Sequence, residues 1–239
     1  MKHCLTQVLT LLTGSASAST RRNTVRNVAE AWAVQQVAIA ASSGLSSNSV
    51  CPCKRTELCK PIGGSSPAAA REVYGFGGGN GSSIDFTRVT TVAWASDPML
   101  MCAAHSAGAR VIMAAPSPEK VFTTNASARA EWVSGAVAAL VANHMDGLVF
   151  DWESPCAPGA ESQRIYAMLI TETRAALRRL SPSYQVSVCV AWSPDGIDGR
   201  NYDILALAAA SDLLYVMDYD TRSQVFDACG ASPSPPPLP

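Results

Sequence analysis

Residues 146–153 read D-G-L-V-F-D-W-E, and the prediction of the fold starts from this stretch. Its apolar centre predicts a buried β-strand, because short apolar runs are typical of strands inside a sheet. Side chains alternate between the two faces of a strand, so one face carries Val149, Asp151 and Glu153. The opposite face carries only apolar side chains, which suits packing against helices. Two carboxylates are therefore predicted at the C-terminal end of the first face.

Apolar runs of this kind recur along the chain and predict six strands in all. They lie at 72–76, 88–95, 109–115, 147–153, 185–192 and 213–220. Helical patterns separate most of them, the longest at 126–143 and 160–180. In the second helix, Ile165, Met168 and Leu169 begin an apolar stripe with three- and four-residue steps. Strands that alternate with helices predict a parallel sheet covered by helices.

Two α/β architectures fit this order. A doubly wound sheet would carry a phosphate-binding turn after its first strand, where residues 75–81 read G-F-G-G-G-N-G. No register of that turn gives G-x-G-x-x-G, and no G-x-x-x-x-G-K-[ST] follows, so the glycines indicate a flexible loop. The alternative is a TIM-type (β/α)8 barrel, whose functional residues lie at the C-terminal ends of its strands. The position of the two carboxylates favours the barrel.

Burying carboxylates without partners is costly, so the pair Asp151 and Glu153 needs a reason. One interpretation is structural: the acids cap the following helix or bind Arg164. The other is glycoside hydrolysis, in which a buried carboxyl beside another carboxylate keeps its proton and acts as a general acid. Acids two residues apart on one strand do not flank a scissile bond, as the usual two-carboxylate mechanisms require. One acid can instead protonate the leaving oxygen while the other supports a nucleophile that belongs to the substrate.

The motif D-G-x-x-x-D-x-E on a fourth strand resembles the signature of family 18 glycoside hydrolases, the chitinases and their relatives. Other segments resemble a lysosomal member of that family that cleaves the GlcNAc-β-1,4-GlcNAc core of N-linked oligosaccharides. They lie at 51–62, 100–111, 190–194 and 216–220. The resemblance implies a partial TIM-type barrel over residues 51–230 and a substrate-assisted, retaining mechanism. It implies no metal ion and no organic cofactor.

By this resemblance Glu153 is the general acid and base, which protonates the glycosidic oxygen and later activates water. Asp151 orients the 2-acetamido group of the substrate and stabilises the positive charge that develops on it. Tyr219 hydrogen-bonds the acetamido oxygen. Met217 and Asp220 are expected to line the substrate site.

Two tryptophans that end predicted strands, Trp94 and Trp192, can stack on sugar faces, although core packing accounts for them equally well. The partner implied by the resemblance is a GlcNAc-containing oligosaccharide. The alternative function is that of a non-catalytic, chitin- or glycan-binding lectin of the chitinase type. Such lectins typically lose the acid that this chain retains as Glu153, which favours the enzyme.

Two features depart from the family pattern. Val149 stands where the family usually has another acid, so Asp151 lacks one partner and we expect slower turnover. Six strands are visible where a complete barrel of about 250 residues has eight, and the resemblance stops before a Pro-rich tail at 231–239. We therefore expect an incomplete barrel, from a truncated product or a fragment. If the short chain is the natural product we expect little catalysis, and if it is a fragment the activity belongs to the complete barrel.

The N-terminus resembles a secretory signal over residues 1–18: a basic start, a short apolar core and an A-x-A site before the cut. An organelle transit peptide is the alternative for this basic, Ser-rich region, and the low-complexity segment 19–50 carries no functional prediction. Two sequons, at Asn80 and Asn125, agree with the secretory route. We expect a lysosomal glycoprotein, with an extracellular one as the alternative.

Three cysteines crowd into the sequence C-P-C-K-R-T-E-L-C at 51–59. In an oxidising compartment this cluster predicts disulfides. The alternative is a zinc site that adds Cys102 or His105 to the cluster, although the C-x-C spacing does not match the usual zinc motif. Cys189 lies inside an apolar strand, where it is expected to be a core residue.

Composition excludes other classes of partner. Eighteen Lys and Arg nearly balance nineteen Asp and Glu, for a net charge of −1. The chain therefore offers no electrostatic footprint for nucleic acid or for an anionic membrane surface. No run of eighteen apolar residues predicts a membrane-spanning helix. With 48% hydrophobic residues the chain can bury a core, and we expect a soluble monomer.

Overall fold

The computed structural model describes residues 55–63, 71–77, 81–95, 97–122 and 124–218. Within these ranges six parallel strands form one sheet in the order β1-β2-β3-β4-β5-β6. The strands are β1 Tyr74–Phe76, β2 Thr91–Ala93, β3 Arg110–Ala114, β4 Gly147–Phe150, β5 Gln185–Ala191 and β6 Leu213–Met217. Each lies inside a predicted apolar run, so the six predicted strands are confirmed in shorter form.

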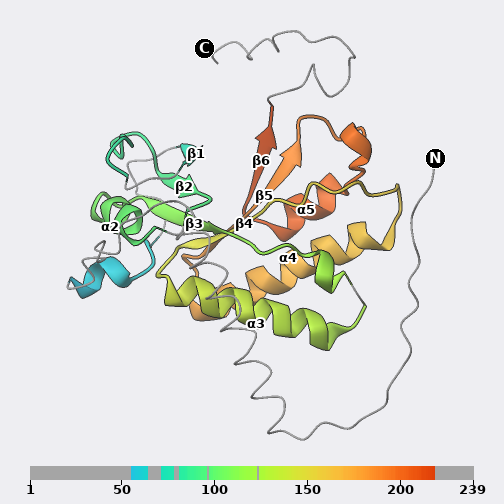
Figure 1. Ribbon diagram of the computed structural model, residues 1–239, viewed down its shortest axis with the longest axis horizontal. Coiled ribbons are helices and arrows are strands. Elements are labelled where there is room, and N and C mark those ends of the chain that lie inside the picture. The colour runs from blue at the N-terminus through green and yellow to red at the C-terminus, as the bar shows by residue number, and fades with distance from the viewer. Residues whose placement is uncertain (1–54, 64–70, 78–80, 96, 123, 219–239) are drawn as a thin grey trace, which may run out of the picture.

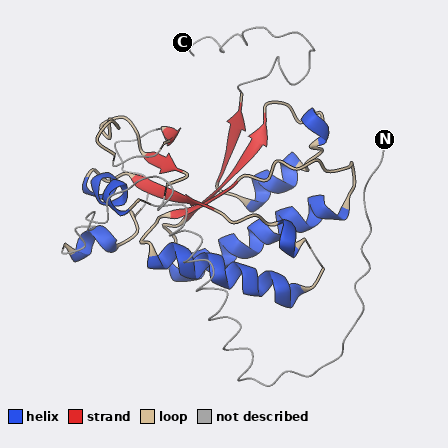
Figure 2. Ribbon diagram, viewed as in Figure 1, coloured by secondary structure: helices blue, strands red, loops and turns tan. Residues whose placement is uncertain are grey.

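Helices connect the later strands and cover the outer face of the sheet (Figures 1 and 2). They are α2 Pro98–Ser106, α3 Ala126–Ala142, α4 Glu161–Leu180 and α5 Ile204–Ala210, with short 3-10 turns η1 Thr56–Cys59, η2 Glu119–Val121 and η3 Ile197–Gly199. The long helices α3 and α4 pack side by side, joined by an ion pair between Arg129 and Glu172 at 2.9 Å. None of the described helices is both long and apolar enough to cross a membrane.

The two faces of the sheet carry separate hydrophobic clusters. Leu148 and Phe150 of β4 are buried in the larger cluster, under the helices. Val149 points the other way, into an inner cluster to which several strands contribute. That inner cluster consists of Ala93, Ile112, Val149, Cys189 and Met217, flanked by Tyr74 and Tyr215. The predicted alternation of faces along β4 is therefore confirmed.

The sheet curls around the inner cluster. The Tyr74 hydroxyl on β1 lies 2.7 Å from the Ser187 hydroxyl on β5, although three strands separate β1 from β5 in the sheet. Phe76 of β1 meets Tyr215 of β6 with 4.6 Å between ring centroids. The two end strands therefore face each other across the inner side. This is an incomplete TIM-type barrel, as predicted.

The first two residues of the D-G-L-V-F-D-W-E stretch are structural. A Cβ atom on Gly147 would lie 2.0 Å from the carbonyl oxygen of Gln185, so only glycine lets β4 and β5 approach this closely. Asp146 is fully buried, and its carboxylate accepts hydrogen bonds of 2.7 Å from the amides of Ile62 and Val111. These bonds tie the segment after η1 to β3 and β4.

His105 of α2 completes this buried network. Its Nε2 lies 2.7 Å from Asp146 Oδ2, and its Nδ1 lies 2.6 Å from the carbonyl oxygen of Leu58. Both partners accept hydrogen bonds, so both ring nitrogens donate and the ring is positively charged. Burial opposes that charge, but the hydrogen bond and the charge of Asp146 outweigh it and raise the pKa of His105.

Several sequence predictions concern residues outside the described ranges: the signal at 1–18, the segment 19–50, the sequon at Asn80 and the tail at 231–239. The other sequon, Asn125, is exposed at the start of α3. There its side chain accepts hydrogen bonds from the backbone amides of the first helical turn, as an N-cap residue does.

Candidate active site

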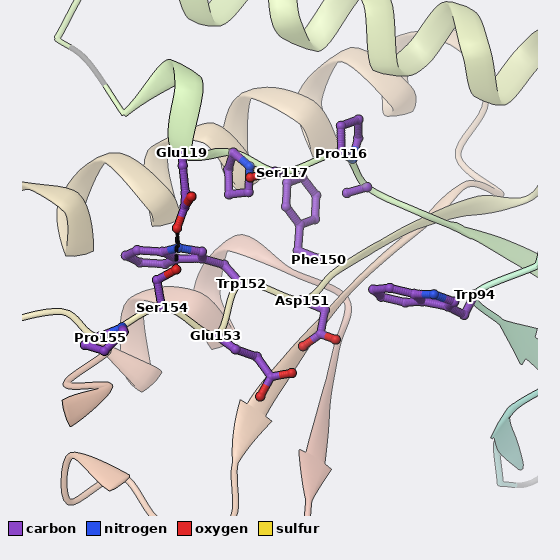
Figure 3. A pocket seen from close by; sticks show the side chains of 12 residues that line it. Trp94, Pro116, Ser117, Glu119, Phe150, Asp151, Trp152, Glu153, Ser154 and Pro155 are labelled. Atoms are coloured by element: carbon purple, nitrogen blue, oxygen red, sulfur yellow. Dashed lines mark hydrogen bonds between the residues drawn. The ribbon is translucent and has the colours of Figure 1, made fainter. Parts of the chain in front are cut away.

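Asp151 and Glu153 follow β4 directly and line a pocket at the C-terminal edge of the sheet (Figure 3). The pocket has a volume of about 650 Å³, within the range of roughly 300–1,000 Å³ that is typical of small-ligand sites. The segments after β2, β3 and β4 form its walls. The lining residues are Trp94, Ala115, Pro116, Ser117, Pro118, Glu119, Phe150, Asp151, Trp152, Glu153, Ser154 and Pro155.

Asp151 is partly buried, and its acidity is shifted accordingly. Burial is the main cause that raises its pKa to about 6, and the charge of Glu153 adds to the rise. The Cys189 thiol and the charge of Arg200 act in the opposite direction. The Oδ1 atom of Asp151 is buried and has no hydrogen-bond partner among the described residues. Asp151 therefore exchanges its proton in the mildly acidic range and has one oxygen available to a ligand.

Glu153 is more accessible, with 53% of its side chain exposed. Its Oε2 accepts a hydrogen bond of 2.5 Å from Nη1 of Arg200, whose own side chain is only 5% exposed. Nη2 of the same guanidinium donates to Asp198 Oδ2 at 2.9 Å. One cation from the loop after β5 thus joins two carboxylates at the mouth of the pocket.

The structural interpretation of the two acids is wrong in both of its parts. Arg164 pairs with Glu161, at 3.3 Å, and not with the acids after β4. Helix α4 begins after Ala160 without a side-chain cap, so neither Asp151 nor Glu153 caps it. Asp151 and Glu153 therefore line the pocket and take no part in capping the helix.

Two side chains without a motif of their own hold the segment that carries Glu153. Glu119, in the turn after β3, accepts hydrogen bonds from the Trp152 indole, at 3.0 Å, and from the Ser154 hydroxyl. Tyr202, in the loop after β5, donates to the Trp152 carbonyl at 2.6 Å and stacks on the Trp152 ring with 4.9 Å between centroids. Their one sequence signal is general: both lie in loops after strands, where barrel enzymes gather functional residues.

The two tryptophans predicted to stack on sugars differ in position. Trp94 follows β2 and lines the pocket, with 49% of its surface exposed. Its backbone φ of 67° lies in the left-handed region, which is rare for a bulky residue and is found most often at functional sites. Trp192 follows β5, is half-buried and is not among the residues that line the pocket. Of this pair, the structure brings only Trp94 to the acids.

The residues predicted on the sixth strand are described in part. Met217 ends β6 and is buried in the inner cluster, with 8% of its surface exposed. Tyr219 and Asp220 lie outside the described residues, so their roles stay predictions.

Val149 stands in the inner cluster, fully buried, one step below Asp151 on the same face. A valine cannot hydrogen-bond the carboxyl above it. The Cys189 thiol, on the neighbouring strand, lowers the pKa of Asp151 and so offsets part of the rise that burial causes. Asp151 therefore keeps one polar neighbour, on β5, even though Val149 replaces the acid that the family usually has on β4.

The cysteines that the structure describes divide into two groups. Cys156 and Cys189 are free, buried thiols, and the place of Cys189 in the inner cluster confirms it as a core residue. Cys59 and Cys102 are each disulfide-bonded. The pairing of the cysteines at 51–59 stays a prediction. The zinc alternative finds no support, because a sulfur in a disulfide is not a thiolate ligand and both nitrogens of His105 are already engaged.

Comparison with known proteins shows which family the sequence of this chain matches. Residues 101–234 match the family described as Glycosyl hydrolases family 18. The chain is 37% identical over 190 residues to di-N-acetylchitobiase of Rattus norvegicus, across 78% of this chain and 51% of that relative. It is 34% identical over 194 residues to di-N-acetylchitobiase of Homo sapiens, across 80% and 50%. The chain spans about half the length of these curated relatives.

Solved chitinase structures share the fold. The class V chitinase of Nicotiana tobaccum superposes with a TM-score of 0.51 at 16% identity, over 62% of this chain and 52% of that chain. The chitinase domain of the spore coat protein CotE from Clostridium difficile gives a TM-score of 0.51 at 18% identity, over 64% and 51%. The six-stranded half-barrel is thus similar to about half of each chitinase chain.

Proposed function

The chain belongs to glycosyl hydrolases family 18, and from this premise we propose that it acts as a glycosidase on GlcNAc-β-1,4-GlcNAc, the chitobiose core of N-linked oligosaccharides. The observation that carries the proposal is the pair Asp151 and Glu153, which line one pocket directly after β4. The relatives named di-N-acetylchitobiase support the choice of substrate.

The proposed mechanism is substrate-assisted. Glu153 in its acid form donates a proton to the glycosidic oxygen as the bond from that oxygen to C1 breaks. The carbonyl oxygen of the substrate's own 2-acetamido group attacks C1 and forms an oxazolinium ion. Water then attacks C1 as the bond from C1 to the acetamido oxygen breaks, which regenerates the acetamido group, and the water gives a proton to the Glu153 carboxylate, which restores the acid. Two inversions at C1 retain the configuration of the sugar.

Asp151 is the proposed partner of the acetamido group. Its Oδ1, which has no hydrogen-bond partner within the part of the chain that the structure describes, can accept a hydrogen bond from the acetamido N–H, and the ionised carboxylate stabilises the positive oxazolinium. Trp94, exposed in the same pocket, offers a flat apolar face to a sugar ring. By the family resemblance, the Tyr219 hydroxyl donates to the acetamido oxygen.

We also propose a lysosomal location, with secretion to the outside as the alternative. The signal-like residues 1–18 support the secretory route. The Asp151 side chain, with a pKa of about 6, populates both its neutral and its charged form in a mildly acidic compartment. Such a compartment suits a site that needs one carboxyl protonated beside one that is ionised.

The test compares the full chain with its Glu153→Gln variant, using GlcNAc-β-1,4-GlcNAc as substrate. We expect hydrolysis by the wild type, and a loss of kcat of about 10²–10⁴-fold in the variant, because general acid catalysis typically contributes that much. Glu161→Gln is the matched control, since this exposed glutamate on α4 lies outside the pocket and should leave kcat unchanged.

Calorimetry with the same disaccharide separates the alternatives. Binding without turnover by the wild type would favour the lectin of the chitinase type. Neither binding nor turnover would show that the substrate is wrong.

A further inference from the structure

Arg200 lies in a loop, yet contacts fix both its backbone and its guanidinium. Its backbone forms a parallel bridge with Cys156, and the Cys156 amide donates to the Gly199 carbonyl at 2.8 Å. Its guanidinium reaches Glu153 at 2.5 Å and Asp198 at 2.9 Å, with 5% of the side chain exposed. The segment after β4 therefore fixes the backbone of Arg200 through Cys156, while Glu153 and Asp198 orient its guanidinium.

Asp198 gives the Arg200 guanidinium a second carboxylate partner besides Glu153. Its backbone φ of 54° is left-handed, a strained conformation for a residue other than glycine, and this places its carboxylate against Arg200. A buried cation that loses its counter-charge is strongly destabilised. With Asp198 in place, the Arg200 guanidinium keeps one carboxylate if Glu153 leaves.

Glu153 has to leave for chemistry to occur. A carboxylate in an ion pair has no proton to donate, whereas the glycosidic oxygen needs one. When Glu153 takes up a proton from solvent, its attraction to the guanidinium falls, and its exposed side chain can turn toward the pocket. The other titratable groups around it are Asp151 after β4, Cys189 on β5, Glu119 after β3 and Tyr202 after β5.

We propose that Arg200 is a positioning residue for Glu153: it holds the carboxylate beside the pocket before the acid step, and Asp198 keeps the guanidinium compensated while Glu153 is released to the glycosidic oxygen. This inference rests on the proposed role of Glu153 as the acid. It assigns a role to two residues of the loop after β5 that belong to no motif in the sequence.

The experiment measures kcat, KM and the pH profile of kcat/KM for the full chain with GlcNAc-β-1,4-GlcNAc. Arg200→Gln removes the cation, so we expect kcat to fall about ten- to hundredfold with KM nearly unchanged. The acidic limb of the profile, which reports the ionisation of Asp151, should move up, because the charge of Arg200 lowers the pKa of that carboxyl. Asp198→Asn leaves Glu153 as the sole carboxylate on the cation, so kcat should fall with KM nearly unchanged.

A fall in kcat at nearly constant KM in both variants, together with the moved limb in Arg200→Gln, distinguishes positioning from a merely structural role. A loop that only supports the fold would lower stability in both variants without moving the limb. Arg88→Gln is the control for losing a positive charge, because Arg88 is 84% exposed and paired with Asp85 away from the pocket, and it should reproduce the wild-type profile. Coinciding limbs in all variants would overturn the proposal.

A second readout is independent of turnover. The charge of Arg200 lowers the pKa of Asp151, so Arg200→Gln should raise the midpoint of the Asp151 carboxyl above about 6 in a ¹³C NMR titration. If the wild type does not hydrolyse the disaccharide, the proposed function fails, and this titration still decides whether Arg200 acts on the acids. If Arg200→Gln does not fold, Arg200→Met removes the same charge and keeps a long apolar stem, and an unmoved midpoint in that variant contradicts the inference.

Discussion

Asp151 shows how the surroundings of one side chain set its chemistry. The carboxyl lies just above the apolar inner cluster and next to another acid, and both conditions disfavour its charge. Its pKa of about 6 means that the folded chain binds this proton more tightly than the unfolded chain does. The same residue is therefore a proposed functional group and a cost to stability at neutral pH.

The first prediction concerns that cost. Because the pKa of Asp151 is raised in the folded state, stability falls as pH rises from 3.8 to about 6. Asp151→Asn removes the charge and should raise the free energy of unfolding at pH 7 by about 1 kcal/mol, with partial exposure keeping the gain small. Urea unfolding at pH 7 and at pH 3.5 measures it. At pH 3.5 the variant and the wild type should agree, and an equal gain at both pH values would contradict the charge account.

A second prediction at this scale concerns Val149. An asparagine there would place an amide donor on the same face as Asp151, whose Oδ1 has no partner among the described residues. We expect Val149→Asn to raise kcat a few-fold and to cost about 1–3 kcal/mol of stability, because Val149 is fully buried in an apolar cluster. Steady-state kinetics and urea unfolding measure the two effects. Val149→Leu, close to asparagine in size but without a hydrogen-bonding group, is the control for shape, and an unchanged kcat in the asparagine variant would contradict the hypothesis.

At the scale of elements, the loops after β3 and β5 hold the segment after β4 from two sides. Glu119 accepts from Trp152 and Ser154, and Tyr202 donates to the carbonyl oxygens of the same two residues. These bonds replace the ladder of the sheet, which ends at Phe150. Catalytic geometry on this segment depends on them, because misplacement by about 1 Å can cost a large factor in rate.

The third prediction tests the hydrogen bonds between the loop after β3 and the segment after β4. Glu119→Ala removes the acceptor of two hydrogen bonds and should lower kcat about tenfold, with little change in KM. Glu119→Gln keeps one carbonyl oxygen in place and should retain most of the activity. Steady-state kinetics with GlcNAc-β-1,4-GlcNAc compares the two. Equal losses in both variants would show that the charge of Glu119 matters more than its hydrogen bonds.

At the scale of the whole molecule, one buried ion pair joins the segment around η1 to the sheet. His105 on α2 bonds the Leu58 carbonyl and Asp146, and Asp146 bonds the amides of Ile62 and Val111. Three parts of the chain, at 58–62, 105–111 and 146, thus meet at this ion pair. Their association depends on the protonation of that ring.

The fourth prediction follows from the sign of this dependence. The pKa of His105 is raised in the folded state, so its contribution is fully present below pH 6.5 and is lost as pH rises through the folded value. The Tm should fall by about 2–4 °C between pH 6.5 and pH 8.5. Asp151 is mostly ionised above pH 6.5, and the part of the change that persists in His105→Gln is its contribution, so the difference between the two proteins reports His105. Calorimetric scans of the wild type and of His105→Gln measure it, and a Tm of the wild type that rises with pH would contradict the charged-ring account.

The end strands of the half-barrel are also a property of the whole molecule. Phe76 on β1 and Val216 on β6 are 41% and 48% exposed. In a closed barrel the first and last strands pair with neighbours, which covers such side chains and removes the edges. The described sheet has β1 and β6 as its two ends, which matches an incomplete barrel and the coverage of about half of each curated relative.

The strands and the carboxylate pair were predictable from the sequence for a simple reason. Side chains two residues apart on a strand share a face, so Asp151 and Glu153 could be assigned to one side without any knowledge of the fold. Their position after a strand likewise predicted a site at the C-terminal edge. The sequence also suggested Trp192 as readily as Trp94, because both end apolar runs, and local spacing does not tell which one reaches the pocket.

The sequence by itself determined the parallel α/β architecture, its incompleteness, the family resemblance and the two acids, because each of these depends on spacing along a single segment. Only the tertiary structure decided that Arg200 is the partner of Glu153, that Glu119 and Tyr202 hold its backbone, and that His105 is charged. Those contacts join residues 33 to 50 positions apart. No local pattern encodes such a contact, because it depends on how the sheet curls and on where the loops after β3 and β5 return.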